Sequence, residues 1–185
     1  MIDQTLKDAE TRMGKAVEVA REDFSGIRTG RAHPAMFAKI TAEYYGTPTP
    51  IQQLASFHIP EPRVVVISAY DKSAVTAIEK AIRDSDLGVS PANDGNVLRV
   101  VLPELTQERR KDYIKLARSK AEDGRVSVRS IRRSAKQALD RMEKDGEVGK
   151  DDVTGAEKRL DGLTKKYVDA IDDLLKHKEA ELIEL

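Results

Sequence analysis

Apolar residues recur at steps of three and four along three long stretches of the chain. This spacing is typical of helices that pack against one another lengthwise. Residues 1–30 predict a first helix ending near Gly30, because glycine commonly stops helices. Residues 106–145 predict a second helix, and a third helix follows the break at Asp145 and Gly146. The three together predict an antiparallel three-helix bundle that buries its own apolar lines.

The predicted core positions of the bundle follow from this spacing. In the first helix they are Ile2, Leu6, Ala9, Met13, Ala16 or Val17, Ala20, Phe24 and Ile27. In the second they are Tyr113, Ala117, Ala121, Gly124, Val128, Ile131, Ala135, Ala138 and Met142. In the third they are Val153, Ala156, Leu160, Leu163, Tyr167, Ala170 or Ile171, Leu174 and Leu182. The second helix would be about 60 Å long at roughly 1.5 Å per residue.

The middle of the chain has a different period and different punctuation. Its apolar runs are rich in β-branched and aromatic residues and are separated by glycine and proline, which predicts strands. The predicted strands are residues 36–45, 51–59, 63–70 and 97–102, with turns at 46–50 and 93–96. Asp71 is placed to cap a short amphipathic helix that continues through Ala74, Ile78 and Ile82. This segment is therefore a small β/α/β insert.

These elements predict an α+β chain with two domains. Residues 1–30 and 106–185 form the helical domain, and residues 31–105 form the insert. Because the insert interrupts the bundle, the chain crosses between the domains twice, and two short linkers side by side can act as a hinge. The hinge residues are Arg31, Ala32, His33 and Pro34 in one linker and Pro103, Glu104 and Leu105 in the other.

A line of cations runs along the second helix, well off its apolar face. At about 100° per residue, one line holds Arg118, Arg125, Arg129, Arg132 and Lys136, with Arg133 a little further round. These side chains face solvent or a ligand. The alternative interpretation, which needs no ligand, is that these side chains form the ordinary solvated face of the helix.

The distribution of charge favours a polyanionic ligand. The chain has no net charge, yet residues 106–145 hold 13 basic against 7 acidic residues, and residues 151–185 hold 6 against 10. A basic strip next to an acidic one favours oriented docking on a charged surface such as nucleic acid.

Other function classes find little support. No apolar run approaches the roughly 20 residues of a membrane span, and the amino terminus lacks the apolar core of a signal peptide, so we expect a cytoplasmic protein that does not bind membranes. The absence of cysteine excludes disulfides and thiolate chemistry. The three histidines have no metal-ligand spacing, and no phosphate-binding glycine loop occurs. We expect no catalytic residue, metal site or cofactor.

Four segments carry a resemblance to a known family. They are IRTGRA at 27–32, YYGTPTPIQQ at 44–53, LPELTQERR at 102–110 and VRSIRR at 128–133. In these segments and their order, the chain resembles the ribosome recycling factors along essentially its whole length. The resemblance implies an L-shaped molecule whose three-helix bundle carries the β/α/β insert on a flexible double hinge.

The resemblance also implies a function. Members of this family bind the ribosome after release of the polypeptide and, with elongation factor G and GTP, split it into subunits, performing no chemistry themselves. The bundle would contact 23S ribosomal RNA of the large subunit, and the insert would supply part of the elongation factor G surface. The partners are thus the ribosome and elongation factor G, and not DNA.

RNA contacts are carried over onto matching arginines. The resemblance assigns them to Arg129, Arg132 and Arg133, and less directly to Arg28, Arg31, Arg109 and Arg110; Arg125 joins them through its place on the charged line. Guanidinium groups suit this role because they bind phosphate through two parallel hydrogen bonds. For Arg28 and Arg31, pairing with acidic groups or with the insert's backbone is an equal alternative.

Two alternatives remain open. The aromatic residues at 44–45, before a Gly-Thr-Pro turn, are read as packing and turn chemistry more readily than as a partner contact. At the level of the whole chain, the heptads would also suit a coiled-coil-like structural or adaptor protein that self-associates. We expect a monomer, because the three apolar lines can satisfy one another within one chain.

Overall fold

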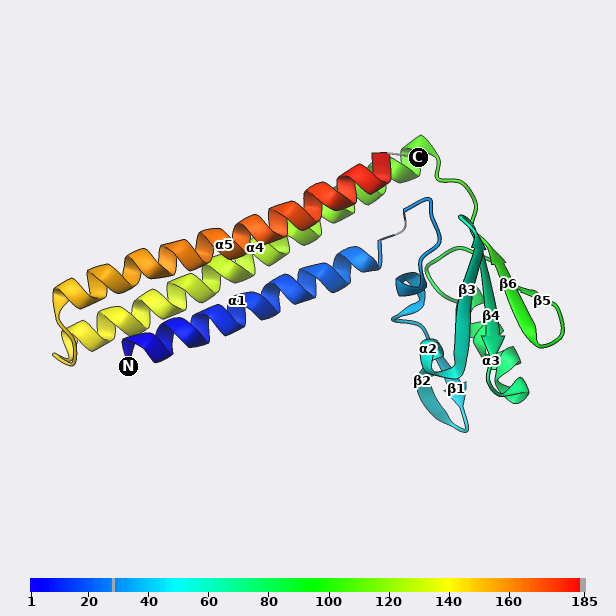
Figure 1. The fold of residues 1–185 in the computed structure, drawn as a ribbon, viewed down its shortest axis with the longest axis horizontal. Coiled ribbons are helices and arrows are strands. Elements are labelled where there is room, and N and C mark those ends of the chain that lie inside the picture. The colour runs from blue at the N-terminus through cyan, green and yellow to red at the C-terminus, as the bar shows by residue number, and fades with distance from the viewer. Residues whose placement is uncertain (28, 184–185) are drawn as a thin grey trace. The chain divides into compact units, whose positions relative to one another are not determined.

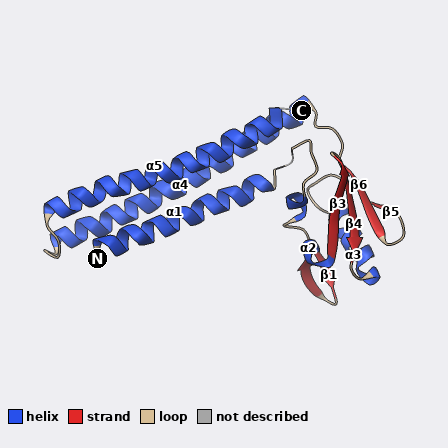
Figure 2. Ribbon diagram, in the orientation of Figure 1, coloured by secondary structure: helices blue, strands red, loops and turns tan. Residues whose placement is uncertain are grey.

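The structure is a computed structural model that describes residues 1–27 and 29–183. It has an α+β fold that divides into two compact units (Figures 1 and 2). The first unit is formed by residues 1–24 and 114–180, and the second by residues 25–113 together with the chain end from residue 181. The predicted domain boundaries near residues 31 and 105 stay a prediction.

Three long helices build the first unit. They are α1 (Ile2–Ser25), α4 (Gln107–Lys144) and α5 (Lys150–Ile183). Figure 1 shows them lying side by side, with α4 and α5 joined at one end by a short turn. The first seven residues of α4 and the last residues of α5 group with the second unit. Helix α1 is shorter than predicted, since it ends at Ser25 instead of near Gly30.

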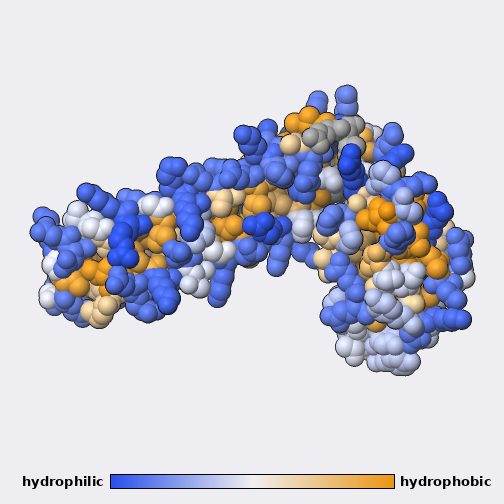
Figure 3. All heavy atoms as spheres, viewed as in Figure 1, coloured by the Kyte–Doolittle hydropathy of each residue, from blue (hydrophilic) through white to orange (hydrophobic). Residues whose placement is uncertain are grey.

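The buried faces of the helices follow the predicted spacing at most positions, but several predicted core positions are only half-buried, among them Tyr113, Leu163, Tyr167 and Leu174. Helix α1 buries Leu6, Ala9, Met13, Val17, Ala20 and Phe24. Helix α4 buries Ala117, Ala121, Gly124, Val128, Ile131, Ala135 and Leu139. Helix α5 buries Val153, Ala156, Leu160, Ile171 and Leu182. Leu139 is fully buried although the sequence pattern pointed to Ala138 and Met142, which are half-buried. Hydrophilic side chains cover most of the bundle surface visible in Figure 3.

The α4–α5 turn is closed by glycine. Gly146 has φ of 72°, the left-handed conformation that glycine adopts without a steric penalty. Its amide donates to the Glu143 carbonyl over 3.0 Å, and the Glu147 amide donates to the Met142 carbonyl over 2.9 Å. This pair of bonds is the Schellman motif, which satisfies the last carbonyls of a helix. It ends α4 where the sequence predicted a break.

The second unit contains two antiparallel sheets. Strands β1 (Thr41–Tyr44) and β2 (Thr47–Pro50) form a hairpin. The other sheet has the order β3-β4-β6-β5. Its strands are β3 (Ala55–Glu61), β4 (Val64–Ala69), β5 (Ala92–Asn93) and β6 (Val97–Val101). Helix α3 (Val75–Arg83) packs three buried residues, Val75, Ile78 and Ile82, into a core that also holds Phe37 and Leu98.

Parts of the strand prediction for this unit are wrong. Residues Pro34–Phe37 form the 3-10 helix η1, because Pro34 starts it and His33 Nδ1 accepts from the Ala35 amide over 3.0 Å. Residues Ile51–Leu54 form a single helical turn, α2. The predicted turn at 46–50 instead contains strand β2, whose two prolines are tolerated because its sheet has only two strands.

The predicted cap of the short helix is confirmed. Asp71 accepts from the Ser73 amide over 2.9 Å and begins the 3-10 helix η2 (Lys72–Ala74), which leads directly into α3. Within the residues that the structure describes, no helix is long and apolar enough to cross a lipid bilayer.

Candidate nucleic-acid interface

The arginines of α4 fall into two groups that the sequence did not separate. Arg118, Arg125 and Arg132 are spaced seven residues apart, so they lie on one side of the helix. Each forms an ion pair with an acid of α5, namely Glu179, Asp172 and Asp161 in that order. These arginines form an interhelical ladder along the seam between α4 and α5. Their exposure differs, from 19% for Arg125 to 65% for Arg118, so the ion pair encloses Arg125 but leaves Arg118 open to solvent.

Arg125 is the most enclosed member of this ladder. Its side chain is 19% exposed, and its Nε donates to Asp172 Oδ1 over 2.6 Å. Its Nη1 also donates to Glu122 Oε2 over 3.1 Å. A guanidinium that is held by two carboxylates and is largely enclosed contributes mainly to the contact between α4 and α5. The predicted RNA contact at Arg125 stays a prediction, with less support from the structure than the exposed arginines have.

Glu122 bridges two arginines of α4. Its other oxygen, Oε1, accepts from Arg129 Nη1 over 3.2 Å, so the carboxylate lies between Arg125 and Arg129. The hydrogen bonds from Arg125 and then from Arg129 hold the pKa of Glu122 below its ordinary value. Glu122 and Arg129 are each about half exposed, so water and salt ions reach this pair.

Arg133 belongs to the second group, on the outward face of α4. Relative to the buried Gly124, Arg129 and Arg133 lie about 140° and 180° round the helix, at about 100° per residue. Both are exposed, and Val126, on the same side of the helix, is 54% exposed. In the described part of the chain, no ion pair is formed by Arg133 within 4.0 Å. This outward face is where an RNA backbone can approach guanidinium groups directly.

The remaining predicted arginines lie in the second unit or outside the description. Arg109 and Arg31 are exposed. Arg110 is half-buried, and its Nη1 donates to the Ile183 carbonyl at the end of α5 over 3.4 Å. A cation there complements the negative end of the helix dipole, so a structural role competes with an RNA role at Arg110. Arg28 lies outside the described residues.

The predicted hinge residues make defined contacts within the second unit. The Ala32 amide donates to the Pro62 carbonyl over 2.7 Å, and the Pro34 carbonyl accepts from Gln52 over 2.9 Å. Glu104 pairs with Arg63 over 3.6 Å. Thr106 caps the following helix by accepting from the Arg109 amide over 3.1 Å. The hinge itself stays a prediction.

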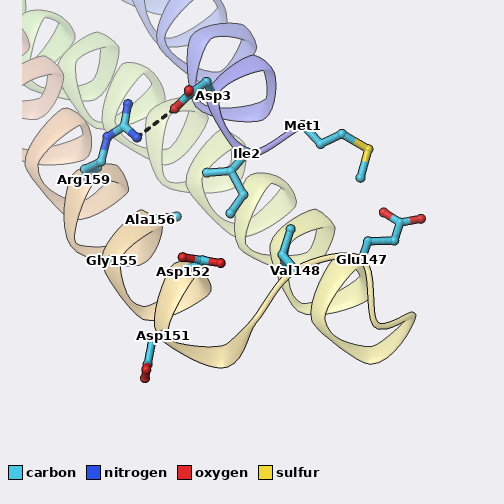
Figure 4. Close-up of a pocket in the computed structure, with 10 residues that line it drawn as sticks. All are labelled: Met1, Ile2, Asp3, Glu147, Val148, Asp151, Asp152, Gly155, Ala156 and Arg159. Carbon is cyan, nitrogen blue, oxygen red and sulfur yellow. Dashed lines mark hydrogen bonds and ion pairs between the residues drawn. The ribbon is translucent and has the colours of Figure 1, made fainter.

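A pocket of about 610 Å³ lies at the closed end of the bundle (Figure 4). It is lined by the start of α1, the α4–α5 turn and the first turns of α5. Its acids are Asp3, Glu147, Asp151 and Asp152, and its one lining arginine, Arg159, pairs with Asp3 over 2.9 Å. Its excess of negative charge makes this pocket an unfavourable surface for phosphate. Among the described residues, no group of three metal-ligating side chains converges.

Comparison with known proteins identifies the family. The family model for ribosome recycling factor matches residues 20–183. The chain belongs to the ribosome recycling factor family. The ribosome-recycling factors of Streptomyces coelicolor and Nocardioides sp. are each 64% identical over the full length of both chains. The one from Kineococcus radiotolerans is 66% identical over 99% of both chains.

Solved structures of the family agree with the fold. A solution structure of the ribosome recycling factor is 41% identical, with a TM-score of 0.82 over 100% of this chain and 98% of the other. A second match belongs to models for the T. thermophilus ribosome recycling factor and the E. coli elongation factor G bound to the E. coli post-termination complex. It is 39% identical, with a TM-score of 0.70 and 99% coverage of both chains. The α+β fold and the membership of a family of translation factors are thereby established.

Proposed function

We propose that this protein binds the post-termination ribosome and, with elongation factor G and GTP, splits it into subunits. The proposal is supported by full-length similarity to ribosome recycling factors. It is also supported by the similar chain that was described together with elongation factor G bound to the post-termination complex. The protein itself catalyses no reaction in this proposal, because elongation factor G hydrolyses the GTP. It acts in the cytoplasm, as a monomer and without DNA.

The observation that carries the proposed contact is the outward face of α4. Arg129 and Arg133 are exposed there, one helical turn apart, so both can reach phosphates of one RNA segment. Their contact with 23S ribosomal RNA would position the bundle on the large subunit. Arg132, which is 36% exposed and bonded to Asp161, would orient this face and lie at its edge.

The adaptor alternative has less support. A protein that self-associates through heptads needs heptad side chains that remain available to a second copy. In this chain the heptad arginines Arg118, Arg125 and Arg132 bind acids of α5, and the apolar positions of α4 are buried in the bundle. The heptad pattern is therefore used within the chain.

The test is sedimentation of purified post-termination ribosomes with this protein, elongation factor G and GTP, with each omitted in turn. We expect separate subunits only when all three are present. Intact ribosomes in the complete mixture, with an elongation factor G that is active in translocation, would overturn the proposal. Sedimentation of the protein alone at increasing concentration tests the adaptor alternative, which requires an oligomer.

A further inference from the structure

The hairpin turn between β1 and β2 holds an unfavourable residue. Tyr44 pairs with Thr47, so Tyr45 and Gly46 form a two-residue turn. Their φ angles are 49° and 77°. Turns with two positive φ angles favour Asn-Gly or Asp-Gly, because an ordinary side chain is strained in this conformation. Among the residues that the structure describes, Tyr45 is the one non-glycine residue with a positive φ.

The side chain of Tyr45 contributes little to the packing of this unit. Tyr45 is 83% exposed, and its ring packs edge-to-face with the neighbouring Tyr44 ring, with centroids 4.5 Å apart. Tyr44, in contrast, is half-buried and donates to Asp71 Oδ2 over 2.7 Å, which ties the hairpin to the start of η2. Packing explains Tyr44. A strained and exposed aromatic residue at Tyr45 indicates function instead.

A second exposed aromatic residue lies near the other end of the same hydrogen bond. Tyr70 directly precedes Asp71 and is 72% exposed. Tyr45 and Tyr70 are thus each one residue away from the two partners of the Tyr44–Asp71 bond, which holds both segments in place. The two tyrosines add aromatic surface that the core of this unit does not use.

The charge of this region points to a protein partner and not to RNA. Residues 31–105 contain 7 basic and 8 acidic residues. The charged residues within two positions of these tyrosines in the chain are Glu43, Asp71 and Lys72, which is not the basic run that would attract phosphate. Exposed tyrosine in weakly charged surroundings is typical of protein interfaces, where aromatic residues provide much of the binding energy.

We propose that Tyr45, together with the exposed Tyr70 of the same unit, is a contact residue for elongation factor G. This inference rests on the proposed function and assigns one of its partners to a named surface. The Tyr45 ring would insert into the partner's surface, and the rigid two-residue turn would present it with little loss of conformational freedom on binding.

The substitution Tyr45→Asn separates binding from stability. Asparagine tolerates positive φ, so this variant should melt at or above the temperature of the parent protein. If the ring is a contact, half-maximal ribosome splitting should need about tenfold more elongation factor G, as expected for loss of an interface aromatic residue. Binding to ribosomes without elongation factor G should be unchanged. Tyr45→Phe, which keeps the ring, should split ribosomes at nearly the parental concentration.

The control is Val101→Thr, which changes another exposed apolar residue of the same unit to one of similar shape. It should leave the elongation factor G titration unchanged. A Tyr45→Asn titration that coincides with the parent would overturn the contact. So would a fall in melting temperature, which would make Tyr45 structural, or weakened ribosome binding without elongation factor G, which would assign the contact to the ribosome. If the parent protein fails to split ribosomes, the proposed function fails instead.

Discussion

Arg125 of α4 donates through Nε to Asp172 of α5 over 2.6 Å, and two further arginines of α4 pair with acids of α5 in the same way. The same arrangement repeats one heptad away on each side, through Arg118 and Arg132. Part of the basic excess of α4 is therefore paired with the acidic excess of α5 along the seam. Arg133, on the outward face, is exposed and can meet a polyanion without first breaking such a pair.

This division predicts that one arginine variant changes ribosome binding and that another changes the stability of the bundle. Arg133→Gln should weaken ribosome binding, and it should reduce the salt dependence of log K by about 0.7 to 0.9, the contribution of one phosphate contact. Its melting temperature should not change, because Arg133 is exposed. Filter binding over a series of salt concentrations, with thermal melting, measures both quantities. Parental salt dependence for Arg133→Gln would exclude it as a phosphate contact.

Arg125→Gln is the matched variant on the seam. It should lower the free energy of unfolding by about 1 kcal/mol, because it removes an ion pair whose arginine is largely enclosed and leaves Asp172 without this partner. For a chain of this size, this loss corresponds to a fall of about 2–4 °C in melting temperature. Unchanged stability would show that the α4–α5 ladder contributes nothing to the bundle.

Glu122 should compete with RNA for Arg129. The two side chains meet at 3.2 Å and are both about half exposed, so phosphate can displace the carboxylate. We expect Glu122→Gln to tighten ribosome binding about twofold to fivefold, the range of a released surface ion pair. Asp140→Asn removes an equal charge from the same helix and should have a smaller effect.

A double-mutant cycle isolates this competition. Glu122→Gln should lose most of its effect in an Arg129→Gln background, because Arg129 is then absent and Arg125, the other partner of Glu122, is still held by Asp172. In an Arg133→Gln background its effect should persist. Equal effects of Glu122→Gln on ribosome binding in both backgrounds would show that Glu122 acts through its negative charge alone and not through its ion pair with Arg129.

Two helical glycines should respond differently to alanine. A Cβ at Gly155 meets nothing within 4 Å, so Gly155→Ala should stabilise the protein by about 0.5–1 kcal/mol through helix propensity. A Cβ at Gly124 would lie 3.0 Å from Ile171 Cδ1, and this crowding should cancel the gain. Urea unfolding of both variants measures the difference, which we expect to be about 1 kcal/mol; equal stabilisation would contradict close packing at Gly124.

The Tyr44–Asp71 bond predicts a dependence of stability on alkaline pH. The hydrogen bond between the two side chains raises the pKa of Tyr44 from 10.0 to about 12. Because the folded state holds this proton more tightly, the stabilising contribution is complete below pH 10 and is lost as the pH rises towards 12. Tyr44→Phe lacks it. The stability difference between parent and variant should therefore shrink between pH 10 and 12 in urea unfolding, and a constant difference would contradict the assignment.

The helical part of the fold was readable from sequence because burial in it depends on spacing along one helix. Positions such as Met13 and Leu160 followed directly. Leu139 was missed because a straight helix drifts from a 3.5-residue repeat, so the buried line moved from Ala138 to its neighbour. Short apolar runs near Pro34 and Ile51 were read as strands, since runs of this length do not distinguish a strand from a helical turn.

The candidate site was only partly readable. The charged line on α4 was visible, but its division into seam and outward arginines depends on acids such as Asp172, which lies 47 residues after Arg125 in the chain. A single helix period cannot supply the register between two helices. The sequence around Tyr45 predicts packing and turn chemistry, because its positive φ and its exposure become apparent only in the folded hairpin.

The most direct test of the RNA contact uses the absence of cysteine from the chain. Ser130→Cys places one thiol on the exposed surface of α4, about 60° round the helix from Arg133, where a tethered iron chelate generates hydroxyl radicals. Lys158→Cys places the same probe on the exposed side of α5. On bound ribosomes we predict cleavage of 23S ribosomal RNA from position 130 that is lost when Arg129 and Arg133 are both changed to glutamine. Strong cleavage from position 158 and none from position 130 would contradict binding through the outward face of α4.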